Sequence, residues 1–152
     1  MIRRAEGRDA AGLAFLLRAL NSEPGLHPER ITAQGVAHDL IGDARVVVLV
    51  AEEEGALLGF ASGHPCYDSG ESRWGYIMND LYVAPESRRQ GLGRALVAGL
   101  AAEAARDGGE YLWWDADEAD EPALAFHRGI GAVEQRVHAF SIGGADFARL
   151  AE

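Results

Sequence analysis

The sequence predicts one α+β domain, and three observations carry the prediction. Apolar residues at helical spacing fill the first part of the chain, β-branched segments joined by short turns follow, and strand-like and helix-like segments then alternate. The 152 residues are enough to bury a core, and 48% hydrophobic and 25% charged residues are ordinary for a folded domain. No repeat or linker interrupts the chain, so we expect a single domain over residues 1–152.

The first part of the chain predicts a short strand and two helices. After a strand at residues 2–5, Asp9 can cap a helix whose apolar residues recur at i, i+3, i+4 and i+7, namely Leu13, Leu16, Leu17 and Leu20. A loop at residues 21–28 leads to a second, weaker helix at residues 29–41.

The middle of the chain predicts three strands. Residues 45–52 are almost continuously apolar and rich in valine, which favours a buried strand. The turn at residues 53–55 leads into a strand at residues 57–64. We expect a loop at residues 65–72 and then a strand at residues 73–83, which Pro85 terminates.

The last part alternates helix and strand. Residues 91–106 form the clearest helix, and two glycines end it. The pattern then predicts a strand at residues 111–115, a helix at residues 121–128 and a last strand at residues 137–142, before a short tail at residues 146–150.

Charge and composition exclude several classes of protein. A formal net charge of -10 disfavours nucleic acid and an anionic membrane surface, but permits a cationic partner. The longest apolar stretch, residues 46–51, is too short to span a bilayer, and no apolar segment of a signal peptide follows Arg3 and Arg4. The single Cys66 fits a reducing, cytoplasmic location, and with His64 it offers too few ligands for a metal site.

The stretch between the strand at residues 73–83 and the helix at residues 91–106 carries the clearest chemical signal. A helix N-terminus offers unpaired N–H groups and partial positive charge, and glycines let a bound group approach the backbone. Arginines surround this turn in an otherwise acidic chain, which predicts a phosphate or pyrophosphate site. A plain solvated turn is the alternative. The Walker spacing and lysine are absent, and Leu96 stands where a Rossmann fingerprint needs glycine.

The turn Arg88-Arg89-Gln90-Gly91-Leu92-Gly93 resembles the R/Q-x-x-G-x-G/A signature of the GNAT (GCN5-related N-acetyltransferase) family. Asp80-Leu81-Tyr82-Val83 resembles the family's β4 strand, and residues 121–132 resemble its second conserved block. The resemblance implies the GNAT fold, a mixed and mostly antiparallel sheet of about six to seven strands flanked by four helices. It implies acetyl-coenzyme A as co-substrate, without a metal. The implied cofactor-binding residues are Leu81, Tyr82, Val83, Arg88, Arg89, Gln90, Gly91, Leu92, Gly93, Arg94, Ala95, Asp120 and His127.

Within that family the sequence is most similar to the diamine (spermidine/spermine) acetyltransferase-like branch. The similarity lies in Cys66-Tyr67-Asp68, in Asp120-Glu121-Pro122-Ala123 and in the ending at residues 139–150. This resemblance implies a small primary amine as acceptor and a homodimer.

Acetyl transfer requires the acceptor amine to lose a proton and the leaving thiolate to gain one. The resemblance places His127 where the family often has a tyrosine that protonates the leaving thiolate. The neighbouring candidates Tyr82 and Tyr111 lie on other elements. His127 either protonates the thiolate or only contacts the cofactor or packs at the helix end. Asn79-Asp80 stands where the diamine branch has Glu-Asp, and an amide cannot accept a proton, so Asp80, or water leading to His64, is the expected base.

An acidic stretch at residues 107–121 lies where the resemblance puts the acceptor channel. Trp113 and Trp114 point to opposite faces of their strand, so one belongs to the core and the other can hold an ammonium group against its ring. A solvated acidic loop is the plainer alternative. The expected substrate-binding residues are Asp80, Trp114, Asp115 and Tyr67.

Together with the predicted anion site, the resemblance implies an acetyl-coenzyme A-dependent N-acetyltransferase that transfers the acetyl group directly to a primary amine in a ternary complex. The expected catalytic residues are His127, Asp80 and Asn79. A sensor or scaffold that binds acetyl-coenzyme A without efficient transfer is the first alternative, and a domain for another nucleotide is the second.

Overall fold

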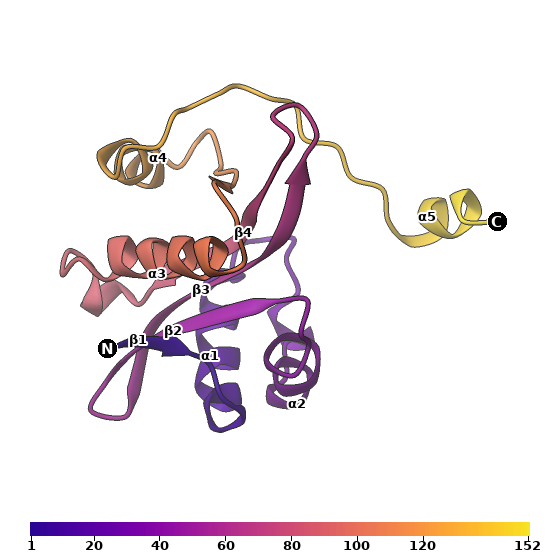
Figure 1. The fold of residues 1–152 in the computed structure, drawn as a ribbon. Helices are drawn as coiled ribbons and strands as arrows, with labels where there is room; N and C mark the ends of the chain where they lie inside the picture. The colour runs from indigo at the N-terminus through magenta and orange to yellow at the C-terminus, as the bar shows by residue number, and fades with distance from the viewer. The chain divides into compact units, whose positions relative to one another are not determined.

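The computed structural model describes residues 1–152, which group into two compact units, Met1–Asp115 and Ala116–Glu152. Each unit is described by itself. The first contains the whole sheet and the turn singled out by the sequence (Figure 1). No helix of the protein combines the length and apolarity needed to cross a membrane.

The sheet has five strands in the order β1-β2-β3-β4-β5. The first four are antiparallel to their neighbours, and β5 runs parallel to β4. Their bounds are β1 Ile2–Arg4, β2 Val47–Glu53, β3 Ala56–Asp68, β4 Arg73–Val83 and β5 Leu112–Trp113. The expected mixed and mostly antiparallel sheet is therefore confirmed, but it has five strands rather than six to seven.

The expected strand at residues 137–142 is absent, which accounts for part of that difference. These residues join no ladder, and Val137, Phe140 and Ile142 are exposed. Alternating apolar residues form a strand only where another strand supplies hydrogen-bond partners. The sequence pattern alone does not reveal whether such a strand is present.

Helices cover both faces of the sheet (Figure 1). Helix α1, Ala10–Leu20, packs its apolar face on Val48, Val50 and Phe60. Helix α3, Leu92–Arg106, packs on the opposite face, where a Cβ on Gly63 would lie 3.0 Å from the Leu100 side chain. Strand residues alternate between these two faces, so each side chain can be assigned to the α1 face or the α3 face.

The expected helix at residues 29–41 is broken into shorter pieces. A 3-10 turn, Pro28–Arg30, is followed by α2, Ala33–Gly35, and by a π-helical turn, Val36–Ile41. The Thr32 side chain caps α2 by accepting a hydrogen bond from Gly35 N–H at 3.0 Å. Two further 3-10 turns are Gly7–Asp9 and Pro85–Ser87.

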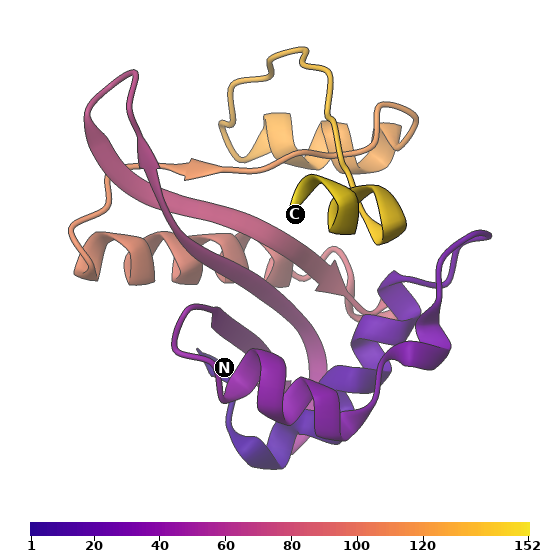
Figure 2. The ribbon, with the colours of Figure 1, turned by 90° about the vertical axis from the view of Figure 1, so that its right-hand side faces the viewer.

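Strands β3 and β4 form one long twisted hairpin (Figure 2). The loop expected at residues 65–72 is wrong in its first half, because β3 continues to Asp68. Beyond Gly63, which pairs with Val47, β3 has no partner on the β2 side. Proline is tolerated on such an edge because its missing N–H breaks no ladder bond, so Pro65 does not end the strand.

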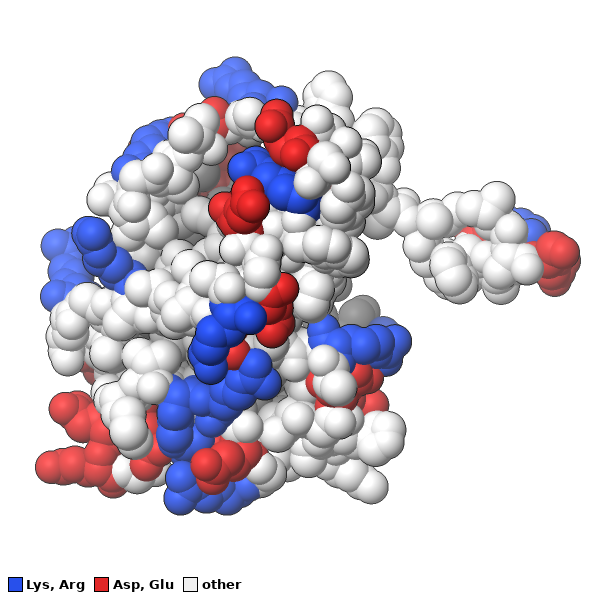
Figure 3. Space-filling model, viewed as in Figure 1, with Lys and Arg blue, Asp and Glu red and all other residues white.

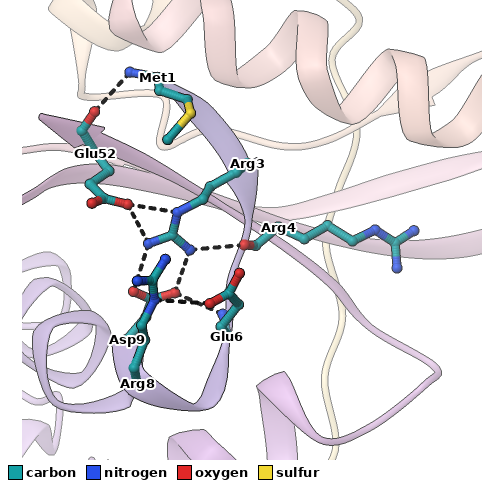
Figure 4. A network of polar contacts seen from close by, with 7 residues as sticks. All are labelled: Met1, Arg3, Arg4, Glu6, Arg8, Asp9 and Glu52. Atoms are coloured by element: carbon teal, nitrogen blue, oxygen red, sulfur yellow. Dashed lines mark hydrogen bonds and ion pairs between the residues drawn. The ribbon is translucent and has the colours of Figure 1, made fainter. Parts of the chain in front are cut away.

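A network of charged groups ties the N-terminus to the sheet (Figure 4). The Arg3 guanidinium lies 2.6 Å from Asp9 Oδ2 and 2.5 Å from Glu52 Oε2, and the Met1 amino group donates to Glu52 O at 2.7 Å. Asp9 precedes α1 but makes no cap with its side chain; it accepts from Glu6 N–H instead. Instead of capping α1 as expected, Asp9 forms an ion pair with Arg3 that joins β1 to the start of α1.

The second unit contains α4, Glu121–Gly129, and α5, Gly144–Leu150. Asp120 caps α4, because its side chain accepts a hydrogen bond from Ala123 N–H at 3.1 Å. Pro122 lies in the first turn of that helix, as the sequence predicts. The tail expected at residues 146–150 is thus part of a short helix.

Candidate active site

The turn before α3 uses backbone angles that few residues adopt. Gly91 has φ +81°, and a Cβ there would meet no atom within 4 Å, so the backbone angle rather than crowding favours glycine. Arg89 also has a positive φ, 62°, although it is not glycine. Such angles cost free energy in non-glycine residues and are often found at ligand sites.

Hydrogen-bond donors remain unpaired in this turn. Residues 89–94 donate no backbone N–H to any acceptor within residues 1–152, and the first helical bond here runs from Ala95 N–H to Gly91 O at 3.0 Å. The N-terminus of a helix of 15 residues adds partial positive charge. An anion placed here would meet several donors at once.

The arginines of the turn divide into two kinds. Arg88 is tied to β4, because its Nε donates to Val83 O at 2.9 Å and its guanidinium lies over the Tyr82 ring at 5.8 Å. Arg89 and Arg94 are exposed and form no ion pair within residues 1–152. Basic side chains project at the end of the molecule where α3 begins (Figure 3). The turn therefore offers two arginines that no carboxylate of the chain neutralises.

One edge of β4 is open beside this turn. Strand β5 pairs with β4 only at Tyr76 and Ile77, so no strand of the sheet lies along residues 78–83 on that side. An extended ligand can bind such an edge by pairing with backbone N–H and C=O groups. The three strand residues expected to contact the donor, Leu81, Tyr82 and Val83, all lie along this edge.

A β-bulge interrupts the pairing of β3 and β4. Gly63 pairs with Met78 but Ser62 pairs with Asp80, which leaves Asn79 as an extra residue on β4. Since Gly63 faces α3, Ser62 and His64 face the α1 side. Asn79 and Asp80 each hydrogen-bond to one of these two side chains. The bulge therefore turns two consecutive side chains toward the same face.

These four side chains, Ser62, His64, Asn79 and Asp80, form what we call the polar cluster. Ser62 Oγ donates to Asp80 Oδ2 at 2.5 Å, and Asn79 Nδ2 lies 3.2 Å from His64 Nδ1. Ser62 is buried, His64 and Asp80 are half-buried, and Asn79 is exposed. The cluster thus offers solvent a carboxylate, an imidazole and an amide on one face.

The aromatic residues predicted at the site do not all share this face. Trp113 pairs with Ile77, two residues before Asn79, so the register puts Trp113 rather than Trp114 on the face of the cluster. Trp114 and the exposed Asp115 follow β5. Tyr67 pairs with Trp74 near the hairpin end, and its hydroxyl lies 2.9 Å from Ser72 Oγ. Its position four residues from Gly63 puts Tyr67 on the α3 face, so the structure does not bring Tyr67 together with Asp80.

The two tyrosines that lie on other elements, Tyr82 and Tyr111, have structural partners. Tyr111 donates its hydroxyl to Cys66 O at 2.9 Å, and burial is the main cause that raises the pKa of this phenol. Tyr82 packs against the core beside Phe60, with ring centroids 6.3 Å apart.

His127 and Asp120 belong to the second unit. The His127 ring is half-buried and lies edge-on to Phe126, with ring centroids 5.2 Å apart. Burial lowers the pKa of His127, and the charge of Asp120 opposes this shift. The imidazolium is therefore scarcer at neutral pH than the ordinary value of 6.5 implies. Asp120 has a structural role as the cap of α4.

Sequence reasoning missed Ser62 and the pairing of His64 with Asn79. The signal available for Ser62 was that it is a polar residue at the end of an apolar run. The bulge that brings Asp80 opposite Ser62 has no sequence signature.

Within residues 1–152, no three His, Cys, Asp or Glu side chains gather as a metal site would require.

Comparison with known proteins shows the family to which this fold and this turn belong. Residues 14–132 match the model of the acetyltransferase (GNAT) family, and the chain belongs to that family. It is 27% identical over 133 residues to the uncharacterized N-acetyltransferase YhfO of Bacillus subtilis, covering 88% of this chain and 89% of that protein.

Two further relatives carry named acceptors or ligands. Mycothiol acetyltransferase of Geodermatophilus obscurus is 34% identical over 85% of this chain, which spans only 41% of that longer protein. The structure of the aminoglycoside acetyltransferase AAC(6')-Iy, in complex with a bisubstrate analog of coenzyme A and acetylneamine, superposes with a TM-score of 0.80 at 18% identity, covering 95% of this chain and 98% of that one. None of these three names a diamine acceptor, so the likeness to the diamine branch stays a prediction.

Proposed function

We propose that the protein transfers an acetyl group from acetyl-coenzyme A to a small primary amine. The observation that carries this proposal is the turn before α3, where residues 89–94 have unpaired backbone N–H groups beside two arginines without carboxylate partners. A diphosphate is an anion of the right size and charge for such a turn. Family membership supports the same chemistry.

The open edge of β4 supports a binding path for the rest of the donor. The pantetheine arm carries amide groups that pair with a strand edge as an added strand does. Along residues 81–83, backbone N–H groups then polarise the thioester carbonyl and stabilise the negative charge that develops on its oxygen. The remaining turn residues, including Gln90, Leu92, Gly93 and Ala95, shape the backbone that holds the diphosphate.

The polar cluster supports the acceptor site. Asp80 gives the cluster a negative charge that attracts an ammonium group, and the amine proton leaves through the cluster, either to the Asp80 carboxylate or through water to His64. The neutral amine attacks the thioester carbon, so that a C–N bond forms as the C–S bond breaks in one ternary complex. Asn79 orients water or substrate, and Trp113 and Asp115 extend the surface toward the acceptor. Trp114 stays a candidate for the acceptor channel.

His127 is the proposed proton donor to the leaving thiolate. Its lowered pKa leaves the protonated ring a minority form at pH 7. This imidazolium transfers its proton to the sulfur and becomes neutral, whereas the neutral ring only donates a hydrogen bond to it. Asp120 partly offsets the effect of burial and favours proton uptake.

The resemblance also supports a homodimer. Light scattering of the purified protein after gel filtration tests this part of the proposal: the mass of a dimer is expected, and the mass of a monomer would contradict it.

The proposed function is tested by release of free thiol from acetyl-coenzyme A over a panel of amines. The panel includes polyamines, amino acids and the aminoglycoside neamine, and turnover above the rate without protein is expected for at least one amine. Tight binding of coenzyme A without turnover on any amine would contradict the proposal and support a sensor or scaffold.

A further inference from the structure

The Asn79–His64 contact has a chemical consequence that depends on the direction of its hydrogen bond. With Nδ2 beside Nδ1 at 3.2 Å, the amide donates, and the neutral ring carries its proton on Nε2. A half-turn of the amide exchanges Nδ2 for Oδ1 at nearly the same position. Oδ1 then accepts from Nδ1–H, and the lone pair of Nε2 is free to accept a proton.

Asp80 and His64 differ in what they offer an acceptor amine. One carboxylate oxygen of Asp80 is occupied by the buried Ser62 hydroxyl. Carboxylates are in general far weaker bases than imidazoles at neutral pH, so a carboxylate suits the binding of an ammonium group and an imidazole suits the removal of its proton. Both groups face the α1 side of the sheet, since Asp80 pairs with Ser62 and His64 lies two residues beyond Ser62 on β3.

We propose that His64 is the general base for the acceptor and that Asn79 positions it, while Asp80 holds the ammonium group. This inference rests on the proposed acetyl transfer. An N–H bond of the bound ammonium breaks, its electron pair stays on the amine nitrogen, and the proton forms a new bond to Nε2 of His64. The positive charge moves to the imidazolium, whose Nδ1–H donates to Asn79 Oδ1. Solvent removes the proton after the acetyl group has been transferred.

The experiment measures steady-state kinetics with the amine of the panel that the wild type acetylates fastest. His64→Ala is expected to lower kcat by about 100-fold with unchanged affinity for coenzyme A, and added imidazole is expected to restore kcat in proportion to its concentration. His38→Ala is the matched control, since His38 is an exposed histidine whose Nδ1 likewise contacts a neighbouring side chain, Asp39, at 2.7 Å.

Asn79 is tested with two variants that both keep a side chain branched at Cγ. Asn79→Asp retains an oxygen that accepts from Nδ1–H and is expected to keep kcat within about threefold, whereas Asn79→Leu is expected to lose about tenfold or more. A purely structural role would not separate these variants in this direction. Should His64→Ala fail to fold, His64→Gln serves in its place, with the same loss of kcat expected while coenzyme A still binds.

Two results would overturn the inference. A kcat of either His64 variant within twofold of the wild type would show that the ring takes no proton. A loss in His64→Ala that imidazole does not restore would assign the ring a structural role. A wild type that acetylates no amine of the panel contradicts the proposed function itself, which is a different outcome.

Discussion

Two consecutive residues, Asn79 and Asp80, show how one irregularity changes the chemistry of a strand. In a regular strand they would point to opposite faces, but the bulge gives both an α1-facing partner, His64 and Ser62. An amide in place of a carboxylate at residue 79 therefore need not remove the base. It can move the role of base to the imidazole beside it.

His127 provides a prediction at the same scale. His127→Phe keeps a ring of similar size but removes the N–H groups, so we expect kcat to fall by about 100-fold while the affinity for coenzyme A changes much less. Thiol-release kinetics and calorimetric titration measure the two quantities. Equal losses in both would favour the alternative in which His127 only contacts the donor.

The Arg3–Asp9 pair predicts a pH dependence of stability. The Arg3 guanidinium holds the pKa of the buried Asp9 below its ordinary value of 3.8. A lowered native pKa stabilises the fold fully above the unfolded value, and this contribution is lost as the pH falls through the native pKa. Asp9→Asn is expected to cost about 3 kcal/mol at pH 7, with a smaller difference from the wild type below pH about 4 in urea unfolding. An equal difference at both pH values would contradict this account.

Among the elements, the start of α3 carries the most specific backbone prediction. Gly91 has φ +81°, so Gly91→Ala is expected to cost about 1–2 kcal/mol of stability and to weaken coenzyme A binding. Gly129→Ala is the matched control: a Cβ there also meets open space, but this helical glycine has no positive φ. Thermal unfolding of both variants measures the difference, and equal stability of the two would contradict the argument.

The elements also show what the sequence can and cannot predict. The strand at residues 73–83 and the helix that starts at the glycine turn were predicted almost to the residue, because their ends depend on local signals such as Pro85 and Gly91. The length of β3, the bulge and the missing strand at residues 137–142 depend on which strands lie alongside. For the same reason the prediction selected Trp114 for the acceptor, whereas the register with Ile77 puts Trp113 on the face of the polar cluster.

At the scale of the whole molecule, the net charge of -10 contrasts with the basic turn. A negative field concentrates a cationic acceptor, whereas the arginines attract the anionic donor locally. We expect kcat/KM for a diamine to fall several-fold between low and physiological ionic strength, because salt screens the long-range field. The reference is the kcat/KM of an acceptor amine that is uncharged at neutral pH. Equal salt dependence of kcat/KM for the diamine and for this uncharged amine would contradict the steering argument.

Binding of acetyl-coenzyme A, compared with S-acetylpantetheine, tests the central claim most directly, because the second ligand keeps the thioester arm and lacks the diphosphate together with the phosphorylated adenosine. In calorimetric titration the wild type is expected to bind acetyl-coenzyme A about 100-fold more tightly. The double variant Arg89→Glu/Gly91→Asp is expected to lose this preference, and Arg45→Glu, which removes an exposed arginine paired with Asp43 far along the chain, is expected to keep it. A double variant with the full preference of the wild type would contradict the assignment of the turn to the diphosphate.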